Sequence, residues 1–61
     1  MCEFNVLLDG QKVFSDVIYA KVDGTTVMVK NIIGGSKEYK NVKITEMDVT
    51  TARLVIETVK M

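Results

Sequence analysis

Apolar and polar residues alternate along most of the chain, which is the pattern of strands buried on one face. In the first segment, Phe4, Val6 and Leu8 share one parity, and Asn5 and Asp9 lie on the other. The same alternation recurs in four further segments, residues 18–22, 27–29, 42–44 and 54–56. β-Branched residues are too frequent in these segments for ordinary helices. The pattern therefore predicts about five strands, the third of which continues into residues 32–33.

Short glycine-containing stretches separate these segments, namely LDGQK, VDGT and IGGSK. Asp-Gly and Gly-Gly favour tight hairpins because glycine adopts positive φ without steric cost. Strands at intervals of about 8 to 12 residues are typical of antiparallel sheets. The only helical candidate is TEMDVTTAR, where Thr45 and Asp48 could cap a helical turn, and a bend into the last strand explains the same residues.

We therefore expect one all-β domain over residues 1–61, a small antiparallel barrel of about five strands of the SH3-like or Sm-like type. Its core should consist of the inward-facing residues Phe4, Val6, Leu8, Ile18, Val22, Val27, Val29, Val42, Ile44, Leu54 and Ile56. Val55 and Val59 lie on the opposite parity of the last strand and, with Leu7 or Met28, form a candidate dimer surface. Scattered exposed apolar residues explain the same positions without a partner.

The small size of the chain favours a second subunit. A domain of 61 residues buries only about 60% of the surface that its unfolded chain exposes. The single cysteine excludes an intramolecular disulfide, and the absence of histidine disfavours a structural zinc site. Oligomerisation is the remaining means of stabilisation, so we expect a homodimer.

Charge and hydropathy limit the class of protein further. Eight basic and eight acidic residues are interspersed and give a net charge of zero, whereas nucleic-acid binders usually carry a basic stripe. No apolar run approaches the roughly 20 residues that span a membrane. With no export signal and one unpaired cysteine, we expect a cytoplasmic protein.

The residue types needed for catalysis are scarce. The chain has no histidine, the commonest acid–base catalyst at neutral pH. Its carboxylates fall in turns or on the polar parity of strands, with no pair at a spacing that demands catalysis. GGSK lacks the first glycine and spacer of a phosphate-binding loop. We therefore expect a protein that is not an enzyme.

One basic segment offers an RNA-binding candidate. Lys37, Lys40 and Lys43 recur every three residues, with Tyr39 between the first two. A base could stack on the tyrosine while the lysines contact phosphates. The same residues also fit the exposed side of an edge strand, which lysines protect from pairing with other chains.

Cys2, the only cysteine, has three interpretations. It shares the parity of Phe4 and Val6 and so fits a small core residue. A catalytic thiol would need a partner that lowers its pKa, and no histidine is available. As a metal ligand, a processed amino-terminal Cys2 would chelate through its amine and thiolate, and a dimer would supply two such pairs.

If Met1 is retained, its amine, the amide nitrogen of Cys2 and the Cys2 thiolate form two fused chelate rings. Either donor set suits a planar site for Ni(II) or Cu(II). Zn(II) prefers a tetrahedral set and would need added ligands.

The opening MCEFNV, the Asp-Gly turn, the length and the strand pattern resemble the small CooT-type nickel-binding family, also labelled predicted RNA-binding proteins. The resemblance implies a β-barrel homodimer that binds nickel through Cys2 and serves delivery to carbon monoxide dehydrogenase. Only Cys2 carries over as a ligand, because Glu3 and Asn5 lie on the opposite face of a regular strand. We therefore expect a nickel-binding accessory protein, with an RNA-binding module using Lys37, Tyr39, Lys40 and Lys43 as the alternative.

Overall fold

The computed structural model describes residues 3–60, which form six strands and no helix. The strands are β1 (Phe4–Leu8), β2 (Gln11–Asp23), β3 (Thr26–Asn31), β4 (Ser36–Tyr39), β5 (Val42–Asp48) and β6 (Arg53–Thr58). The predicted all-β class is therefore confirmed. The alternation did not predict β4, because Tyr39 is its only large apolar residue; an edge strand was only the second interpretation of the basic segment.

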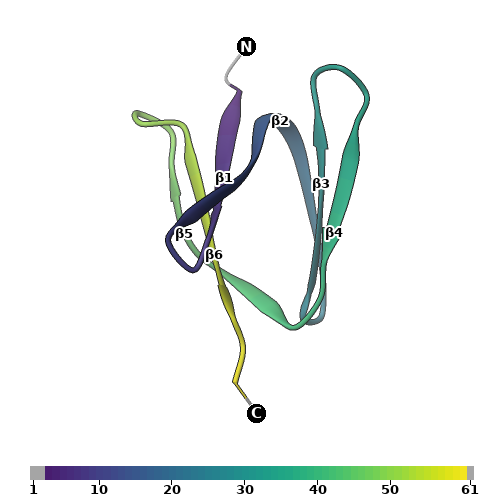
Figure 1. The fold of residues 1–61 in the computed structure, drawn as a ribbon, viewed down its shortest axis with the longest axis vertical. Coiled ribbons are helices and arrows are strands. Elements are labelled where there is room, and N and C mark those ends of the chain that lie inside the picture. Colours follow the sequence, from purple (N-terminus) through teal and green to yellow (C-terminus); the bar gives the residue numbers. More distant parts are fainter. Residues whose placement is uncertain (1–2, 61) are drawn as a thin grey trace.

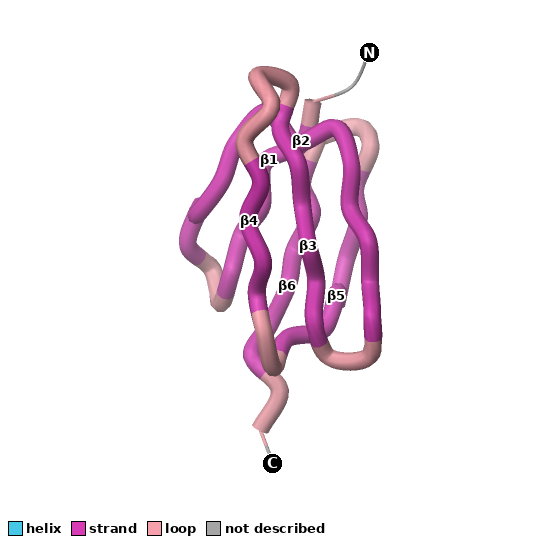
Figure 2. The backbone as a smooth tube through the Cα atoms, turned by 90° about the vertical axis from the view of Figure 1, so that its right-hand side faces the viewer, coloured by secondary structure: helices cyan, strands magenta, loops and turns pink. Residues whose placement is uncertain are grey.

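The six strands form one curled sheet in the order β4-β3-β2-β1-β6-β5. Neighbouring strands are antiparallel except β1 and β6, which run parallel. Figure 1 shows β1, β5 and β6 on one side and β3 and β4 on the other, with the long β2 shared between them. In Figure 2, β3 and β4 lie in front of β5 and β6, so the sheet folds into two layers. It encloses a core but does not close into a barrel, since β4 and β5 are unpaired edges.

The predicted Asp-Gly turns connect the first two hairpins. Asp9 and Gly10 join β1 to β2, with φ angles of 49° and 89°, and Leu8 pairs directly with Gln11. Two consecutive positive φ values are what a type I′ hairpin turn requires. Gly24, with φ of 62°, begins the two-residue link between Asp23 and Thr26, which are paired.

The segment considered as a helix is a bend. β5 ends at Asp48, and its Oδ1 accepts hydrogen bonds from the backbone N–H groups of Thr50 and Thr51, at 3.0 and 3.2 Å. The Thr50 hydroxyl also donates to this oxygen, at 2.6 Å. This Asx-type turn reverses the chain into β6 without a helical turn.

The core between the two layers consists of aliphatic side chains. Its buried members are Val6, Val17, Val27, Val29, Val42, Leu54 and Ile56. Partly buried residues pack around them, namely Phe4, Leu8, Val13, Phe14 and Tyr39. Eight of the predicted core residues therefore lie in or against the core.

Three predicted core residues are exposed instead. Ile18 is 44% exposed, Val22 56% and Ile44 37%. The pairing of β1 with β2 ends at Val17, so the rest of β2 has no neighbouring strand on that side. An irregularity between Val17 and Tyr19 also shifts the alternation. Ile44 faces inward from β5, an edge strand that leaves one flank of its side chain open.

The third strand is shorter than predicted, because it ends at Asn31. The Asn31 side chain accepts a hydrogen bond from the Gly35 N–H at 2.7 Å, and its backbone oxygen accepts one from Gly34 at 3.1 Å. These bonds turn the chain into β4. Ile32 and Ile33 therefore lie in an exposed loop, with Ile33 87% exposed.

Candidate functional site

The candidate metal ligands lie at the beginning of the chain. Met1 and Cys2 are outside the described residues. Glu3 is exposed and precedes β1. From Asn5 onward the strand is anchored, because the Asn5 N–H donates to the Ala52 carbonyl at 2.8 Å. The chain therefore enters the sheet two residues after Cys2.

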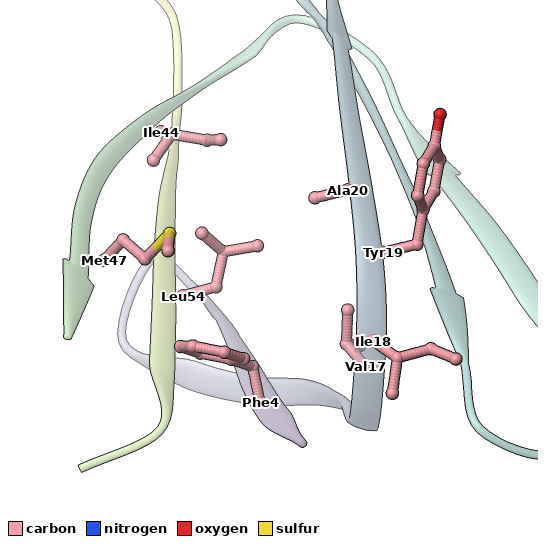
Figure 3. Close-up of a pocket in the computed structure, with 8 residues that line it drawn as sticks. All are labelled: Phe4, Val17, Ile18, Tyr19, Ala20, Ile44, Met47 and Leu54. Carbon is pink, nitrogen blue, oxygen red and sulfur yellow. The ribbon is translucent and has the colours of Figure 1, made fainter. Parts of the chain in front are cut away.

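An apolar cleft lies beside this entry point, between β2 and the β5–β6 hairpin. Its volume is about 300 Å³, and its walls are formed by Phe4, Val17, Ile18, Tyr19, Ala20, Ile44, Met47 and Leu54. Figure 3 shows Ala20 and Leu54 pointing toward one another across it, whereas Tyr19 points away. None of the lining residues carries a carboxylate or an amine. The cleft therefore offers mainly apolar contact, with the Tyr19 phenol as its only ionisable side chain.

Sequence reasoning located part of this cleft without identifying it. Phe4, Ile18, Ile44 and Leu54 were expected inside a closed core, and all four line the cleft. Leu54 is buried in the core and Phe4 packs against it, whereas Ile18 and Ile44 are exposed. Met47, which is 63% exposed, was not expected to contribute. Its position depends on the irregularity between Ile44 and Glu46 in β5, which a regular alternation does not predict.

The tyrosine proposed for RNA stacking faces the core. Tyr39 pairs with the fully buried Val27 and packs against the core cluster. Its hydroxyl is buried without a hydrogen-bond partner among the described residues, and this burial raises the pKa of the phenol. The ring is therefore not offered as an open stacking surface.

The three lysines are distributed over different surfaces. Lys37 pairs with Val29 and shares the parity of Tyr39. Lys40 lines an open polar hollow on the other face, together with Lys21, Asp23, Thr26, Met28 and Glu38. Lys43 lies opposite Glu57 on β6. The structure therefore does not gather the predicted RNA contacts on one surface, and RNA binding through them stays a prediction.

The exposed aromatic residue is Tyr19 on β2. Its ring is 46% exposed, and the Lys30 Nζ lies 5.3 Å from the ring centre. Cation–π contacts at such exposed sites contribute about 0.5–1 kcal/mol. The sequence spacing of Tyr19 and Lys30 gave no sign of this pair, which forms because the two residues are directly opposite in the β2–β3 hairpin.

The carboxylates with shifted pKa values stabilise turns. The Thr58 hydroxyl donates to Asp9 Oδ2 at 2.7 Å and its N–H to Oδ1 at 3.0 Å, which lowers the pKa of Asp9. Hydrogen bonds from Thr50 and Thr51 lower the pKa of Asp48 in the same way. Within residues 3–60, no three acidic, histidine or cysteine residues gather at metal-binding distance. The described carboxylates therefore provide no separate metal centre.

The four residues of the candidate dimer surface are already partly covered within the single chain. Leu7 and Val55 pair across β1 and β6, and both are partly covered, as are Met28 and Val59. The more exposed large apolar residues are elsewhere, namely Ile18, Tyr19, Val22, Ile32, Ile33, Ile44, Met47 and Val49.

A family model described as "CO dehydrogenase accessory protein CooT" matches residues 1–57, nearly the whole chain and including Cys2. The chain belongs to the CooT family. The resemblance noted from MCEFNV is thus confirmed over residues 1–57. CooT proteins are described as accessory proteins and not as catalysts, in keeping with the scarcity of catalytic residues.

No curated protein matches this CooT-family chain. Within the part of the chain that the structure describes, no helix is long and apolar enough to cross a membrane. The family itself implies an accessory role toward CO dehydrogenase.

Proposed function

We propose that this CooT-family chain is a nickel-handling accessory protein that binds Ni(II) as cargo through Cys2 and supplies it to a nickel enzyme such as carbon monoxide dehydrogenase. The observation that carries the proposal is the family match, which begins at residue 1 and so includes the only cysteine. The described residues supply no alternative cluster of ligands.

The chemistry of the chain terminus suits nickel. A thiolate together with an amine or amide nitrogen forms a chelate of the planar type that Ni(II) and Cu(II) accept. Because amine and thiol must lose protons before they coordinate, binding should weaken as the pH falls. The start of β1 at Phe4 would hold the site close to a rigid strand.

A homodimer would complete the site. If Met1 is removed, one chain offers the amine and thiolate of Cys2, so two chains offer the four donors of a planar set. If Met1 is retained, one chain offers three donors and the thiolate of the second chain would supply the fourth. The ion would then be shared by two subunits and passed on by ligand exchange. We therefore expect one Ni(II) per two chains.

Titration of the purified protein with Ni(II), followed through thiolate-to-nickel absorption, tests this function. The wild-type protein should saturate at half an equivalent per chain, and Cys2→Ser should lose the absorption band. Cu(II) and Zn(II) titrations establish the metal preference. Intact mass spectrometry of the same samples shows whether Met1 is present and which nitrogen is the terminal amine.

A variant with one residue added before the natural terminus is the matched control for the amine. It keeps the thiol and the fold but displaces the amine from the chelate, so its nickel affinity should fall if the amine is a ligand. Unchanged nickel binding by Cys2→Ser would contradict the proposed function outright.

A further inference from the structure

We propose that the loop between β3 and β4 docks this protein onto nickel-free carbon monoxide dehydrogenase, at an apolar pocket bordered by carboxylates. The identity of this partner rests on the proposed nickel function. The loop comprises residues 32–35. Its tip is Ile33, which at 87% is the most exposed large apolar side chain of the described residues, and the neighbouring Ile32 is 48% exposed.

Two isoleucines are out of place in a turn. Turn positions ordinarily hold Gly, Pro, Asn, Asp or Ser, which accept the required backbone angles or bond to the backbone. Gly34, with φ of 92°, and Gly35 already supply this chemistry. A side chain that is 87% exposed also adds little to the core. The apolar surface of Ile32 and Ile33 is therefore available for contact with another molecule.

Hydrogen bonds close the loop at its base. The Asn31 N–H donates to the Gly35 carbonyl at 2.8 Å, and the Ile32 N–H donates to the Asp16 carbonyl on β2 at 2.9 Å. A Cβ atom at Gly35 would lie 3.1 Å from Asn31 Oδ1, so the tight packing here depends on glycine. A loop that is already closed loses less conformational entropy on binding than an open segment. Ile33 is thus presented as an anchor from a built turn.

The loop lies at the end of the molecule where β1 begins. Phe4, the first residue of β1, and Asn31, the last of β3, both pair with Val17 of β2. Figures 1 and 2 both show the loop and the start of β1 at this end. Paired Cα atoms are up to about 5.5 Å apart, and each residue adds at most about 3.6 Å along the chain, so the Cα atom of Cys2 lies within about 18 Å of that of Asn31.

This distance is smaller than a protein interface. A standard interface of about 800 Å² per partner is about 30 Å across, so one enzyme surface can cover both the loop and the beginning of the chain. An enzyme docked on Ile33 would therefore lie next to the proposed nickel ligand, Cys2, as transfer by ligand exchange requires.

The charges around the loop indicate the chemistry of the partner. Lys30 and Lys37 flank it on the two strands of the hairpin, both exposed, and neither forms an ion pair within residues 3–60. Asp16 is the acidic residue that contacts the loop, so two lysines against one aspartate leave the surroundings basic. A second copy seated here would bring the lysines of both loops together. A carboxylate-bordered pocket on a different protein complements them.

Binding of the metal-free protein to immobilised, nickel-free carbon monoxide dehydrogenase of the same organism tests the docking site without nickel transfer. Ile33→Ser should weaken binding about tenfold, because the apolar anchor that leaves water on docking is lost. Val22→Ser is the matched control. Val22 is 56% exposed beside the β2–β3 turn, at the other end of the molecule (Figure 1), so binding should change by less than about twofold. Circular dichroism verifies that both variants are folded.

Lys37→Glu tests the carboxylate border. It should weaken binding severalfold at low salt, and its difference from the wild-type protein should shrink as salt is added, because ions screen exposed charges. Lys12→Glu, at an exposed lysine on the β1–β2 hairpin, is the matched control and should bind like the wild-type protein. Equal effects of the two lysine variants would contradict the carboxylate border.

Each remaining outcome bears on one proposal. Undetectable binding of the wild-type protein, or equal binding by Ile33→Ser, would overturn the docking site. Loss of a homodimer in sedimentation of Ile33→Ser would also overturn it, because the loop would then contact a second copy. If Ile33→Ser loses binding but the wild-type protein takes up no nickel, the docking site stands and the nickel function fails. If nickel binds to Cys2 and Ile33→Ser binds the enzyme normally, the reverse holds.

Discussion

The buried hydroxyl of Tyr39 predicts that removing an oxygen atom stabilises this protein. The ring packs against the core from the edge strand β4, and its hydroxyl is buried without a hydrogen-bond partner among residues 3–60. Tyr39→Phe keeps the ring and deletes only this hydroxyl. The variant therefore relieves a desolvation cost without creating a large cavity.

The expected gain can be worked from that geometry. A buried polar group without a partner costs about 1–3 kcal/mol. Because Tyr39 is only half-buried as a residue, we expect a gain near the lower end, about 1 kcal/mol. In a domain of this size, 1 kcal/mol raises Tm by about 4–8 °C. Total stability for 61 residues is about 3–9 kcal/mol, so the change is a large fraction of the whole.

Urea and thermal unfolding at one fixed protein concentration measure the effect, because dimerisation makes apparent stability depend on concentration. Tyr19→Phe is the matched control, since Tyr19 is 46% exposed on the same sheet and its stability should change by less than about 0.5 kcal/mol. A loss of stability in Tyr39→Phe would refute the reasoning, because it would mean that the hydroxyl has a favourable partner.

The buried phenol of Tyr39 should also make the protein less stable at alkaline pH. Burial raises the pKa of Tyr39 above its ordinary value, so the unfolded chain ionises first as the pH rises. The free energy of unfolding therefore keeps its full value below the ordinary phenol pKa of about 10. It decreases as the pH rises through the folded pKa, because the folded protein would then have to bury a charged phenolate. Tyr39→Phe should remove this loss, and Tyr19→Phe should retain it.

Three further predictions concern the core and the turns. Ile56→Val should cost about 0.5–1.5 kcal/mol in urea unfolding because Ile56 is fully buried, whereas Ile33→Val, at an 87% exposed site, should be neutral. Hydrogen bonds from threonines lower the pKa values of Asp9 and Asp48. The stability that these carboxylates contribute is therefore full above the ordinary carboxyl pKa of about 4 and is lost as the pH falls through the folded pKa values. In Asp48→Asn, the loss of stability at acid pH, measured by circular dichroism, should be smaller than in the wild-type protein. Gly10→Ala should cost about 1–2 kcal/mol in thermal unfolding because the φ of 89° strains any residue with a Cβ.

The all-β class and most of the core were predictable because they depend on local alternation and on turn chemistry. Val27 and Val29 share one parity between Thr26 and Lys30 and are fully buried, and Asp9 and Gly10 form the expected hairpin turn. The parallel pairing of β1 with β6 was not predictable in this way. It joins the two ends of the chain, and no local signal specifies which distant strands become neighbours.

The candidate site shows the same division. The role of Cys2 as a ligand came from the chemistry of a lone thiol near the beginning of the chain and from resemblance. The family match covers this residue, and its role as a ligand stays a prediction. The prediction that the Tyr39 ring is open for stacking was wrong, because the pairing of β4 with β3 turns the ring toward Val27. Its neighbours in sequence are Lys and Glu, which made the segment look like an exposed strand.

Ile18 and Ile44 were predicted to be buried and are exposed in the single chain. The expected homodimer offers an explanation for this error. Their alternation has the form expected of buried residues, and in the single chain they line the cleft at 44% and 37% exposure. If the chain forms the homodimer expected above, the hydrophobic pattern would include residues that the second copy covers. On this reasoning Ile18→Thr should lower stability more at high protein concentration, where the dimer forms, than at low concentration. An equal loss at both concentrations would assign the pattern to the single chain and not to its dimer.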